Sequence, residues 1–196
     1  GGKLNITENC LDRHLENKQN QTAITWIANN PNEKNINLSY KALFKEVCKF
    51  ANVLKKGGVN KGDRICLYMP MIPELAIAVL ACARIGAVHS VVFAGFSAKS
   101  LADRINDAAC KVLVTADGGF RGNKIIPLKE IANEAMENTP SIKQCIVVKR
   151  TKSSVQMQNK RDSWWHEEMQ KSNSKCEIEI MDSEDPLFIL YTSGST

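Results

Sequence analysis

Short apolar runs alternate with segments of helical periodicity along most of this sequence. The runs that we expect to form strands cover residues 22–27, 37–40, 63–68, 88–93, 111–115, 145–148 and 187–190. The segments that we expect to form helices cover residues 43–54, 73–84 and 97–108, and a further helix opens at Pro127. Strands that alternate with helices of about a dozen residues build βαβ units. The sequence therefore predicts an α/β fold whose mostly parallel sheet is flanked by helices.

Residues that favour helix ends stand at the expected boundaries. Pro73 falls where a first helical turn accepts proline, and Glu74 suits the positive end of the helix dipole. Ser97 is a preferred N-cap residue. Glycines at 57–58 and at 86 follow two of the helical segments and are expected to end them.

The composition is that of a globular protein that can bury its own core. The chain has 196 residues, of which 43% are hydrophobic and 24% are charged, and its length alone fits one domain. Its 26 Lys and Arg residues exceed its 21 Asp and Glu residues to give a net charge of +5. The excess is spread along the chain, which disfavours a nucleic-acid-binding function.

The cysteines and histidines indicate neither a disulfide framework nor a metal site. There are seven cysteines, an odd number, and no C-x-x-C motif occurs. Most lie in apolar runs, so we expect their thiols to be buried and reduced. Reduced thiols indicate a reducing compartment, and we expect the protein in the cytoplasm and also in the nucleus. The three histidines lack a ligand-type partner three or four residues away: His14, His89 and His166.

The most apolar stretch, residues 69–93, does not fit a transmembrane segment. It contains Pro73, Glu74, Arg84 and His89, which interrupt the apolar run. No signal-peptide pattern opens the sequence. We therefore expect no membrane partner.

Segment 151–186 breaks the alternation. It is polar and rich in Lys, Ser and Gln, and we expect a surface excursion within the domain that carries a short helix. Trp164 and Trp165 are expected to pack that helix onto the sheet, although an aromatic pair is also able to stack on a base.

Several other side chains are given structural roles. Met69 and Met71 are expected in the core. Asp117 is a catalytic residue type, but no base or metal constellation accompanies it. Three arginines are expected to form ion pairs or to lie on the surface: Arg64, Arg84 and Arg104.

The expected strand 187–190 leads into a run of hydroxyl residues and glycine, Tyr191-Thr-Ser-Gly-Ser-Thr196. Such a loop offers hydroxyls and unobstructed N–H groups to phosphate oxygens. It lacks the G-x-x-x-x-G-K pattern of the P-loop. From the residues alone, a phosphate-binding loop and an ordinary Ser/Thr/Gly turn are equally supported.

Several segments together resemble one family. The run 191–196 is similar to the opening of the phosphate-loop motif of adenylate-forming enzymes. Within that superfamily, the resemblance to acetyl-CoA synthetases extends over nearly the whole chain except residues 151–176. It is carried by segments 1–5, 9–14, 69–74, 80–87, 89–97 and 117–124.

The resemblance implies ATP-dependent activation of acetate to an acetyl-adenylate, followed by transfer to coenzyme A. It places the ATP β- and γ-phosphates on Thr192, Ser193, Gly194, Ser195 and Thr196. It places the CoA nucleotide on Phe93, Gly95, Arg121 and Lys124. Lys124 stands at a position where the family often has a second Arg. Arg grips a phosphate bidentately, whereas Lys supplies a point charge. Mg²⁺ would accompany ATP.

The resemblance also implies a domain organisation. Residues 1–196 would be a partial N-terminal AMP-binding domain, with residues 1–21 as a family-specific N-terminal segment. The catalytic residues would lie beyond Thr196, so the chain alone is expected to be inactive.

Two alternatives remain open. One is a related short-chain ligase such as a propionyl-CoA synthetase, because the carboxylate pocket would lie outside this sequence. The other is a nucleotide- or CoA-binding module without catalysis. The sequence says nothing of oligomeric state.

Overall fold

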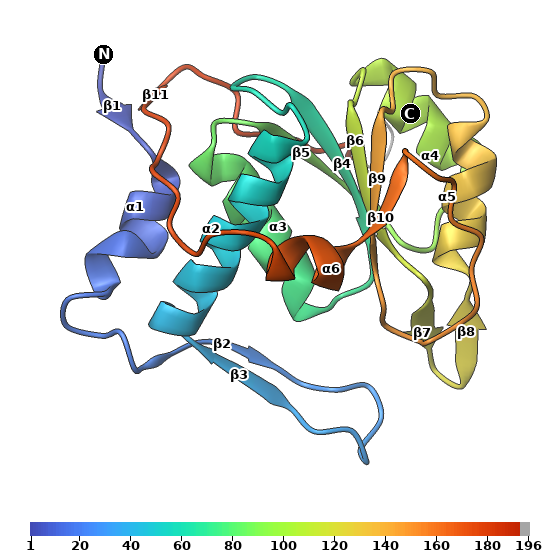
Figure 1. Cartoon of the computed structure of the whole chain (residues 1–196), viewed down its shortest axis with the longest axis horizontal. Coiled ribbons are helices and arrows are strands. Elements are labelled where there is room, and N and C mark those ends of the chain that lie inside the picture. Colours follow the sequence, from blue (N-terminus) through green and yellow to red (C-terminus); the bar gives the residue numbers. More distant parts are fainter. Residues whose placement is uncertain (193–196) are drawn as a thin grey trace.

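A six-stranded parallel sheet forms the centre of the computed structural model, which describes residues 1–192 (Figure 1). The strand order is β10-β9-β6-β4-β5-β12, and each neighbouring pair is parallel. The strands are β4 (Arg64–Met69), β5 (Val88–Phe93), β6 (Val112–Ala116), β9 (Gln144–Val148), β10 (Asp162–Trp164) and β12 (Phe188–Ile189). The predicted α/β fold with a mostly parallel sheet is confirmed.

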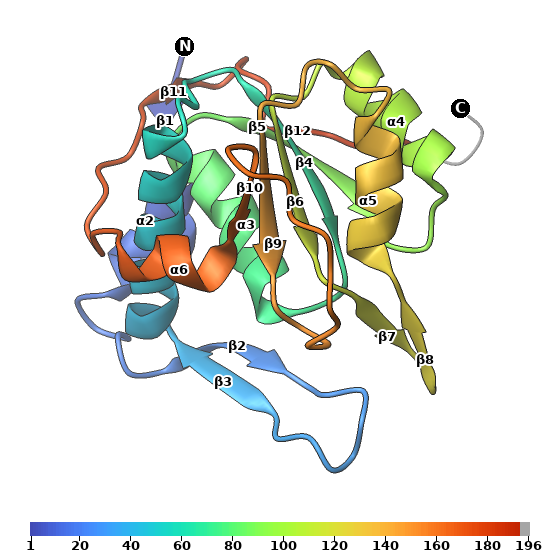
Figure 2. The same cartoon turned by 45° about the vertical axis from the view of Figure 1, so that its right-hand side comes forward.

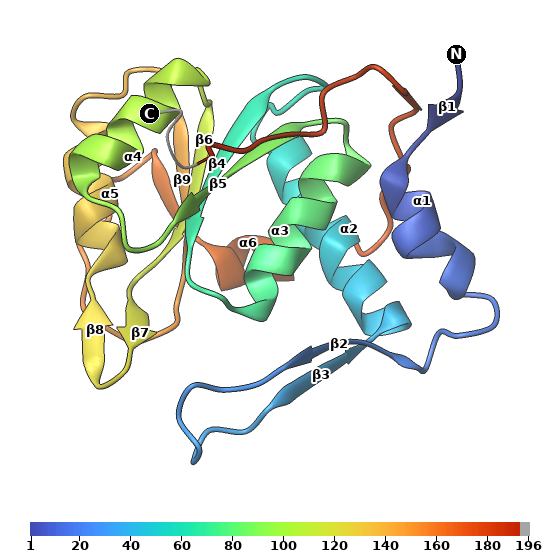
Figure 3. The same cartoon turned by 180° about the vertical axis from the view of Figure 1, so that it is seen from behind.

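Helices cover both faces of this sheet (Figures 1 and 3). On one face lie α2 (Tyr40–Lys56), α3 (Pro73–Arg84) and α6 (Trp165–Gln170), and on the other lie α4 (Ala98–Asp107) and α5 (Leu128–Met136). The split follows from the strand order, because β5 and β6 flank β4 on opposite sides. Right-handed crossovers that leave in opposite directions place α3 and α4 on opposite faces.

The helix boundaries follow the local signals in the sequence. The Ser39 and Ser97 hydroxyls accept hydrogen bonds from the amides three residues on, at 3.2 and 3.3 Å, and so cap α2 and α4. Pro73 occupies the first turn of α3, and Gly57 caps the end of α2. The predicted helices are confirmed, with ends that differ by a few residues.

Within residues 1–192, three short antiparallel strand pairs lie outside the main sheet. β2 (Thr22–Trp26) pairs with β3 (Ile36–Ser39), β7 (Gly119–Arg121) with β8 (Lys124–Ile126), and β1 (Lys3–Leu4) with β11 (Met181–Asp182). The short helices α1 (Ile6–Cys10) and η1 (Asp12–His14) follow β1. Figure 2 shows the β2–β3 and β7–β8 hairpins projecting at the same edge of the main sheet, where its strands end.

Segment 151–186 contributes more to the fold than its composition predicts. The expected short helix is α6, and Trp165 packs on α2, with its ring stacked on Phe50 at 3.8 Å between centroids. The same segment also supplies β10, an edge strand of the main sheet. The sequence missed this strand because it is three residues long and only half-buried.

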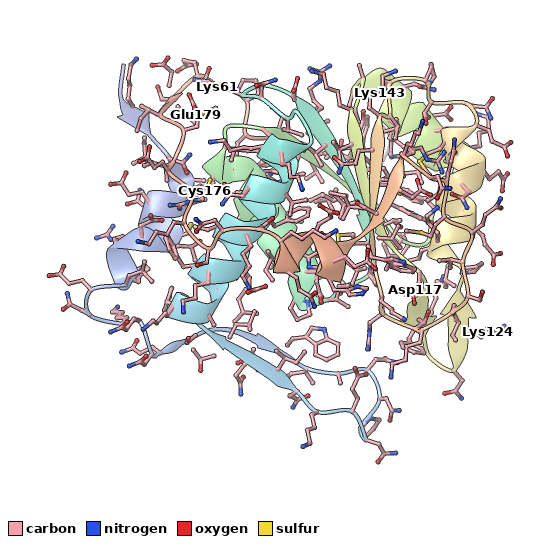
Figure 4. All side chains as sticks on the ribbon, viewed as in Figure 1. Lys61, Asp117, Lys124, Lys143, Cys176 and Glu179 are labelled. Carbon is pink, nitrogen blue, oxygen red and sulfur yellow. The ribbon has the colours of Figure 1, made fainter. Side chains whose placement is uncertain are left out.

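The buried Arg84 ties the ends of the chain to α3. Its side chain is 4% exposed and pairs with Asp12 at 2.8 and 3.0 Å, and its Nε donates to the Cys176 carbonyl at 2.7 Å. Figure 4 shows Cys176 and Glu179 on the segment that passes α1. The Glu179 amide in turn donates to the Arg84 carbonyl at 2.8 Å. The expected ion pair of this arginine is therefore confirmed.

The predicted burial of the methionines is confirmed for one of the two, and the predicted free thiols are confirmed. Met69 is buried, as expected, but Met71 is 82% exposed, so its assignment to the core was wrong. It follows the end of β4, where the chain leaves the sheet. All seven cysteines are free, and all but Cys10 are buried.

Candidate functional site

A cavity of about 650 Å³ lies at the carboxyl edge of the parallel sheet. Its walls come from the segments that follow β4 (residues 70–72), β5 (94–96), β6 (119–121) and β12 (190–191). The connections that leave the adjacent strands β4 and β6 run to opposite faces of the sheet. A crevice at such a point is where open α/β sheets bind ligands.

Three of the residues predicted to contact CoA line this cavity: Phe93, Gly95 and Arg121. Lys124 does not line it, but sits at the other side of the hairpin turn, where it pairs with Arg121 across the β7–β8 ladder (Figure 4). Thr192 directly follows Tyr191, which lines the cavity. Ser193, Gly194, Ser195 and Thr196 lie outside the described residues.

The segment after β5 owes its shape to Gly95. A Cβ at this position would lie 2.3 Å from Cε1 of Phe93, so the aromatic ring covers the glycine. Phe93 is 63% exposed and meets Phe96 edge to face, with 5.7 Å between ring centroids. The rings present an apolar surface at the cavity wall, where a planar ligand can stack.

The glycine-rich stretch 117–124 is a β-hairpin rather than a loop. Gly122 adopts a positive φ of +57° at the turn, a conformation that glycine adopts readily. A Cβ at Gly118 would lie 2.7 Å from Oγ1 of Thr151, so this position has no room for a side chain. Arg121 ends the first of the two strands and lies beside the cavity.

Asp117 has a structural role at the start of this hairpin (Figure 4). It is 1% exposed, and its Oδ1 accepts hydrogen bonds from the amides of Gly118, Arg150 and Thr151 at 2.8, 2.7 and 2.9 Å. Among the described residues, its Oδ2 has no hydrogen-bond partner. The carboxylate thereby joins the carboxyl ends of β6 and β9.

Arg104 also lines the cavity, a role that the sequence did not predict. Its guanidinium lies between the rings of Phe96 and Tyr191, at 4.5 and 5.2 Å from their centroids. The Tyr191 hydroxyl donates to Asp107 at 2.6 Å. Helix α4 therefore contacts both the segment after β5 and the residue that precedes the predicted phosphate loop.

Arg150 is a second arginine that lines the cavity and that the sequence did not predict for the site. Its guanidinium lies 5.1 Å from the Trp26 ring centroid and 5.0 Å from that of Phe120, and its two terminal nitrogens donate to Glu33 at 2.6 and 2.8 Å. These hydrogen bonds lower the pKa of Glu33. The only feature of the sequence that could have indicated a role for Arg150 in the site is its position two residues after the predicted strand 145–148.

The cavity combines positive charge with an apolar wall. Arg104, Arg121 and Arg150 line it, together with five aromatic side chains from different segments: Trp26, Phe93, Phe96, Phe120 and Tyr191. Such a lining suits a ligand with both an aromatic ring and an anionic group. Within residues 1–192 no group of three His, Cys, Asp or Glu side chains is placed to hold a metal ion. Over the same residues, no helix combines the length and the apolar character that crossing a membrane requires.

Comparisons with known proteins find relatives that match the whole of this chain. The acetyl-coenzyme A synthetases of Desulfatibacillum aliphaticivorans and Bdellovibrio bacteriovorus are 58% and 55% identical to this chain, over 195 and 196 residues. Each match covers 100% of this chain and 30% of the relative, so the chain spans less than a third of the length of these relatives.

A solved structure supports the fold independently. An acyl-CoA synthetase of Brucella canis has a TM-score of 0.79 to this chain at 19% identity, with 98% of this chain and 32% of that chain covered. The sequence profile described as AMP-binding enzyme matches residues 11–196. Because this profile covers nearly the whole sequence, the chain belongs to the AMP-binding enzyme family.

Proposed function

We propose that this chain is the N-terminal part of an acetate–CoA ligase. The acetate carboxylate attacks the α-phosphate of ATP to give acetyl-adenylate and pyrophosphate, and the CoA thiol then displaces AMP. Curated relatives at 52–58% identity carry the name acetyl-coenzyme A synthetase. The observation that carries the proposal is the cavity in which Phe93, Gly95 and Arg121 meet.

In this proposal the cavity takes the nucleotide part of CoA. The exposed guanidinium of Arg121 grips the 3′-phosphate bidentately, and the rings of Phe93 and Phe96 offer stacking surfaces to the base. Lys124, outside the cavity wall, adds a point charge at the hairpin turn.

The ATP phosphates are assigned to Thr192 and the four residues that follow it. Tyr191 holds the start of this run against α4 through its hydrogen bond to Asp107. Mg²⁺ would neutralise phosphate charge when bound. Residues 1–192 supply no cluster of metal-type side chains, and no step is routed through the ion. The free, mostly buried cysteines suit a reducing compartment, and we place the protein in the cytoplasm.

The experiment compares the full-length gene product that contains this sequence with the 196-residue chain. We expect acetate-dependent pyrophosphate release and acetyl-CoA formation from the former and none from the latter. Parallel assays with propionate and butyrate distinguish an acetate ligase from a related short-chain ligase. Pyrophosphate release by the isolated chain would contradict the proposed division of the active site.

CoA binding is tested by calorimetry on the full-length protein. Arg121→Ala is expected to weaken CoA affinity about tenfold or more, as for the loss of a charge-assisted bidentate contact. Arg13→Ala removes the same charge from an exposed arginine that lies outside the cavity wall, and its CoA affinity should match the wild type. An equal loss in both variants would mean that only overall charge matters.

A further inference from the structure

The two hairpins at the cavity mouth are joined by one side chain, Arg150. The β2–β3 hairpin supplies Trp26 and, from its connecting loop, Glu33, and the β7–β8 hairpin supplies Phe120. Arg150 itself follows the end of β9 in the main sheet. One guanidinium therefore contacts two hairpins that are far apart in sequence.

Trp26 and the Arg150 backbone are each anchored by a further hydrogen bond. The Trp26 indole Nε1–H donates to the Met71 carbonyl at 2.8 Å, which fixes the ring against the segment that follows β4. The Arg150 amide donates to the buried Asp117 at 2.7 Å, which fixes the backbone that carries the guanidinium. The Arg150 side chain is 17% exposed, so water weakens its pairing with Glu33 less than on an open surface.

The β7–β8 hairpin depends on such support. It consists of two strands of three residues each, and a two-stranded hairpin of this kind is marginally stable alone. At its base, Gly119 lies close to Pro70 and Leu128. Further out, Phe120 is 43% exposed, and its ring faces Arg150. Arg121 is the next residue, so its place beside the cavity depends on where Phe120 is held.

We propose that Arg150 is a positioning residue for the CoA site: its guanidinium contacts the rings of both Phe120 and Trp26, and it thereby holds the β7–β8 hairpin so that Arg121 faces the cavity. This inference rests on the proposed function, because it assigns CoA to Arg121. In this proposal Arg150 acts through Arg121 rather than on the ligand, and its charge is balanced by the two hydrogen bonds that its terminal nitrogens donate to Glu33. Glu74 and Asp117 add negative charge around the same guanidinium.

The test uses the full-length gene product with Arg150→Met and Arg150→Lys. Met keeps much of the side-chain length and removes the charge, so the KM for CoA should rise about tenfold, which corresponds to about 1.4 kcal/mol. Lys restores the charge but neither the flat stacking surface nor the bidentate pairing, so it should recover only part of the loss. The KM values for ATP and acetate should stay within about twofold of the wild type.

A second readout does not depend on CoA. Hydrogen exchange of the amides in residues 119–126 should speed up in Arg150→Met, because the clamp on Phe120 is lost. Lys149→Met is the matched control: it removes a neighbouring exposed charge whose nearest ring is Trp164, and it should leave both readouts unchanged. If Arg150→Met fails to fold, Glu33→Gln provides a milder variant that should shift both readouts in the same direction.

A double-mutant cycle decides whether Arg150 acts through Arg121. In the Arg121→Ala background, adding Arg150→Met should cause no further rise in the KM for CoA. The proposal would be overturned by any of three results. The two substitutions could raise the KM for CoA additively, Arg150→Met could leave the hydrogen exchange of residues 119–126 unchanged, or it could raise the KM for ATP as much as the KM for CoA. If Arg121→Ala alone leaves CoA binding intact, the assignment of CoA fails, while the exchange measurement still decides whether Arg150 positions the hairpin.

Discussion

Replacing Lys129 by Met should destabilise the protein strongly, because this lysine is part of a fully buried ion pair. Lys129 lies on α5 and Asp162 on the edge strand β10, and both side chains are 0% exposed. The Nζ–Oδ2 distance is 2.8 Å, and Nζ also donates to the Gln156 carbonyl at 3.1 Å and to Asn133. The pair therefore attaches the polar segment 151–186, through β10, to helix α5.

The structure predicts that substituting Lys129 and substituting Asp162 lower the free energy of unfolding by different amounts. Removing one partner of a buried pair costs about 3–5 kcal/mol. Lys129→Met leaves Asp162 with hydrogen bonds from Arg161 Nε at 2.6 Å and from the Gln158 amide at 2.8 Å, so we expect about 3 kcal/mol. Asp162→Asn leaves the buried ammonium without a counter-ion, so we expect about 5 kcal/mol.

Urea unfolding followed by circular dichroism measures both free energies. The control is Lys99→Met, which breaks an exposed pair with Asp103 at 3.0 Å, where the side chains are 87% and 61% exposed. Its cost should be at most about 0.5 kcal/mol. A cost below about 1 kcal/mol for Lys129→Met, or a smaller cost for Asp162→Asn than for Lys129→Met, would refute the reasoning.

Three further predictions concern single buried or partly buried groups. Burial lowers the pKa of His89 to about 4. Below pH about 6.5 the unfolded chain binds a proton at this residue that the folded chain does not, so the free energy of unfolding should fall by up to about 3 kcal/mol as the pH drops towards 4. His89→Gln should flatten that part of a stability–pH curve, and an unchanged slope would contradict this origin. Asp117→Ala should cost about 3 kcal/mol in urea unfolding by leaving three amides without their acceptor, and Asp117→Asn, which keeps one oxygen, should cost clearly less. Tyr191→Phe should cost about 1 kcal/mol by removing the hydrogen bond to Asp107, and equal stability of the two proteins would show that this bond contributes nothing.

The strands of the main sheet were predictable where burial makes their sequences continuously apolar. β4 and β6 are buried along almost their whole length, and parallel strands covered on both faces give uninterrupted Val, Ile and Leu runs. The strand β10 has no such signal, because it lies at an edge and contains only Asp-Ser-Trp. Its place in the sheet depends on pairing with β9 and on the buried contact of Asp162, which is formed only in the folded chain.

The site was predictable only in part, for a related reason. Phe93, Gly95 and Arg121 were identified by resemblance, and the structure brings them to one cavity. The partner of Arg150 was not predictable, because Glu33 lies 117 residues away in the sequence and no periodicity links the two. Contacts between loops that follow different strands leave no pattern within either loop.

The hairpin at residues 119–126 shows what geometry adds to resemblance. Arg121 and Lys124 are both cations in the same motif, and they face each other across the ladder. Of the two, only Arg121 lines the cavity: it follows Phe120, whose ring centroid lies 5.0 Å from the Arg150 guanidinium, whereas Lys124 begins β8. A guanidinium in a fixed place can meet a phosphate with two aligned hydrogen bonds, while an ammonium at the turn acts at longer range through charge alone. On the proposed assignment of CoA to this cavity, substitutions of Arg121 should change which nucleotide is preferred, whereas substitutions of Lys124 should change mainly how CoA binding depends on salt concentration.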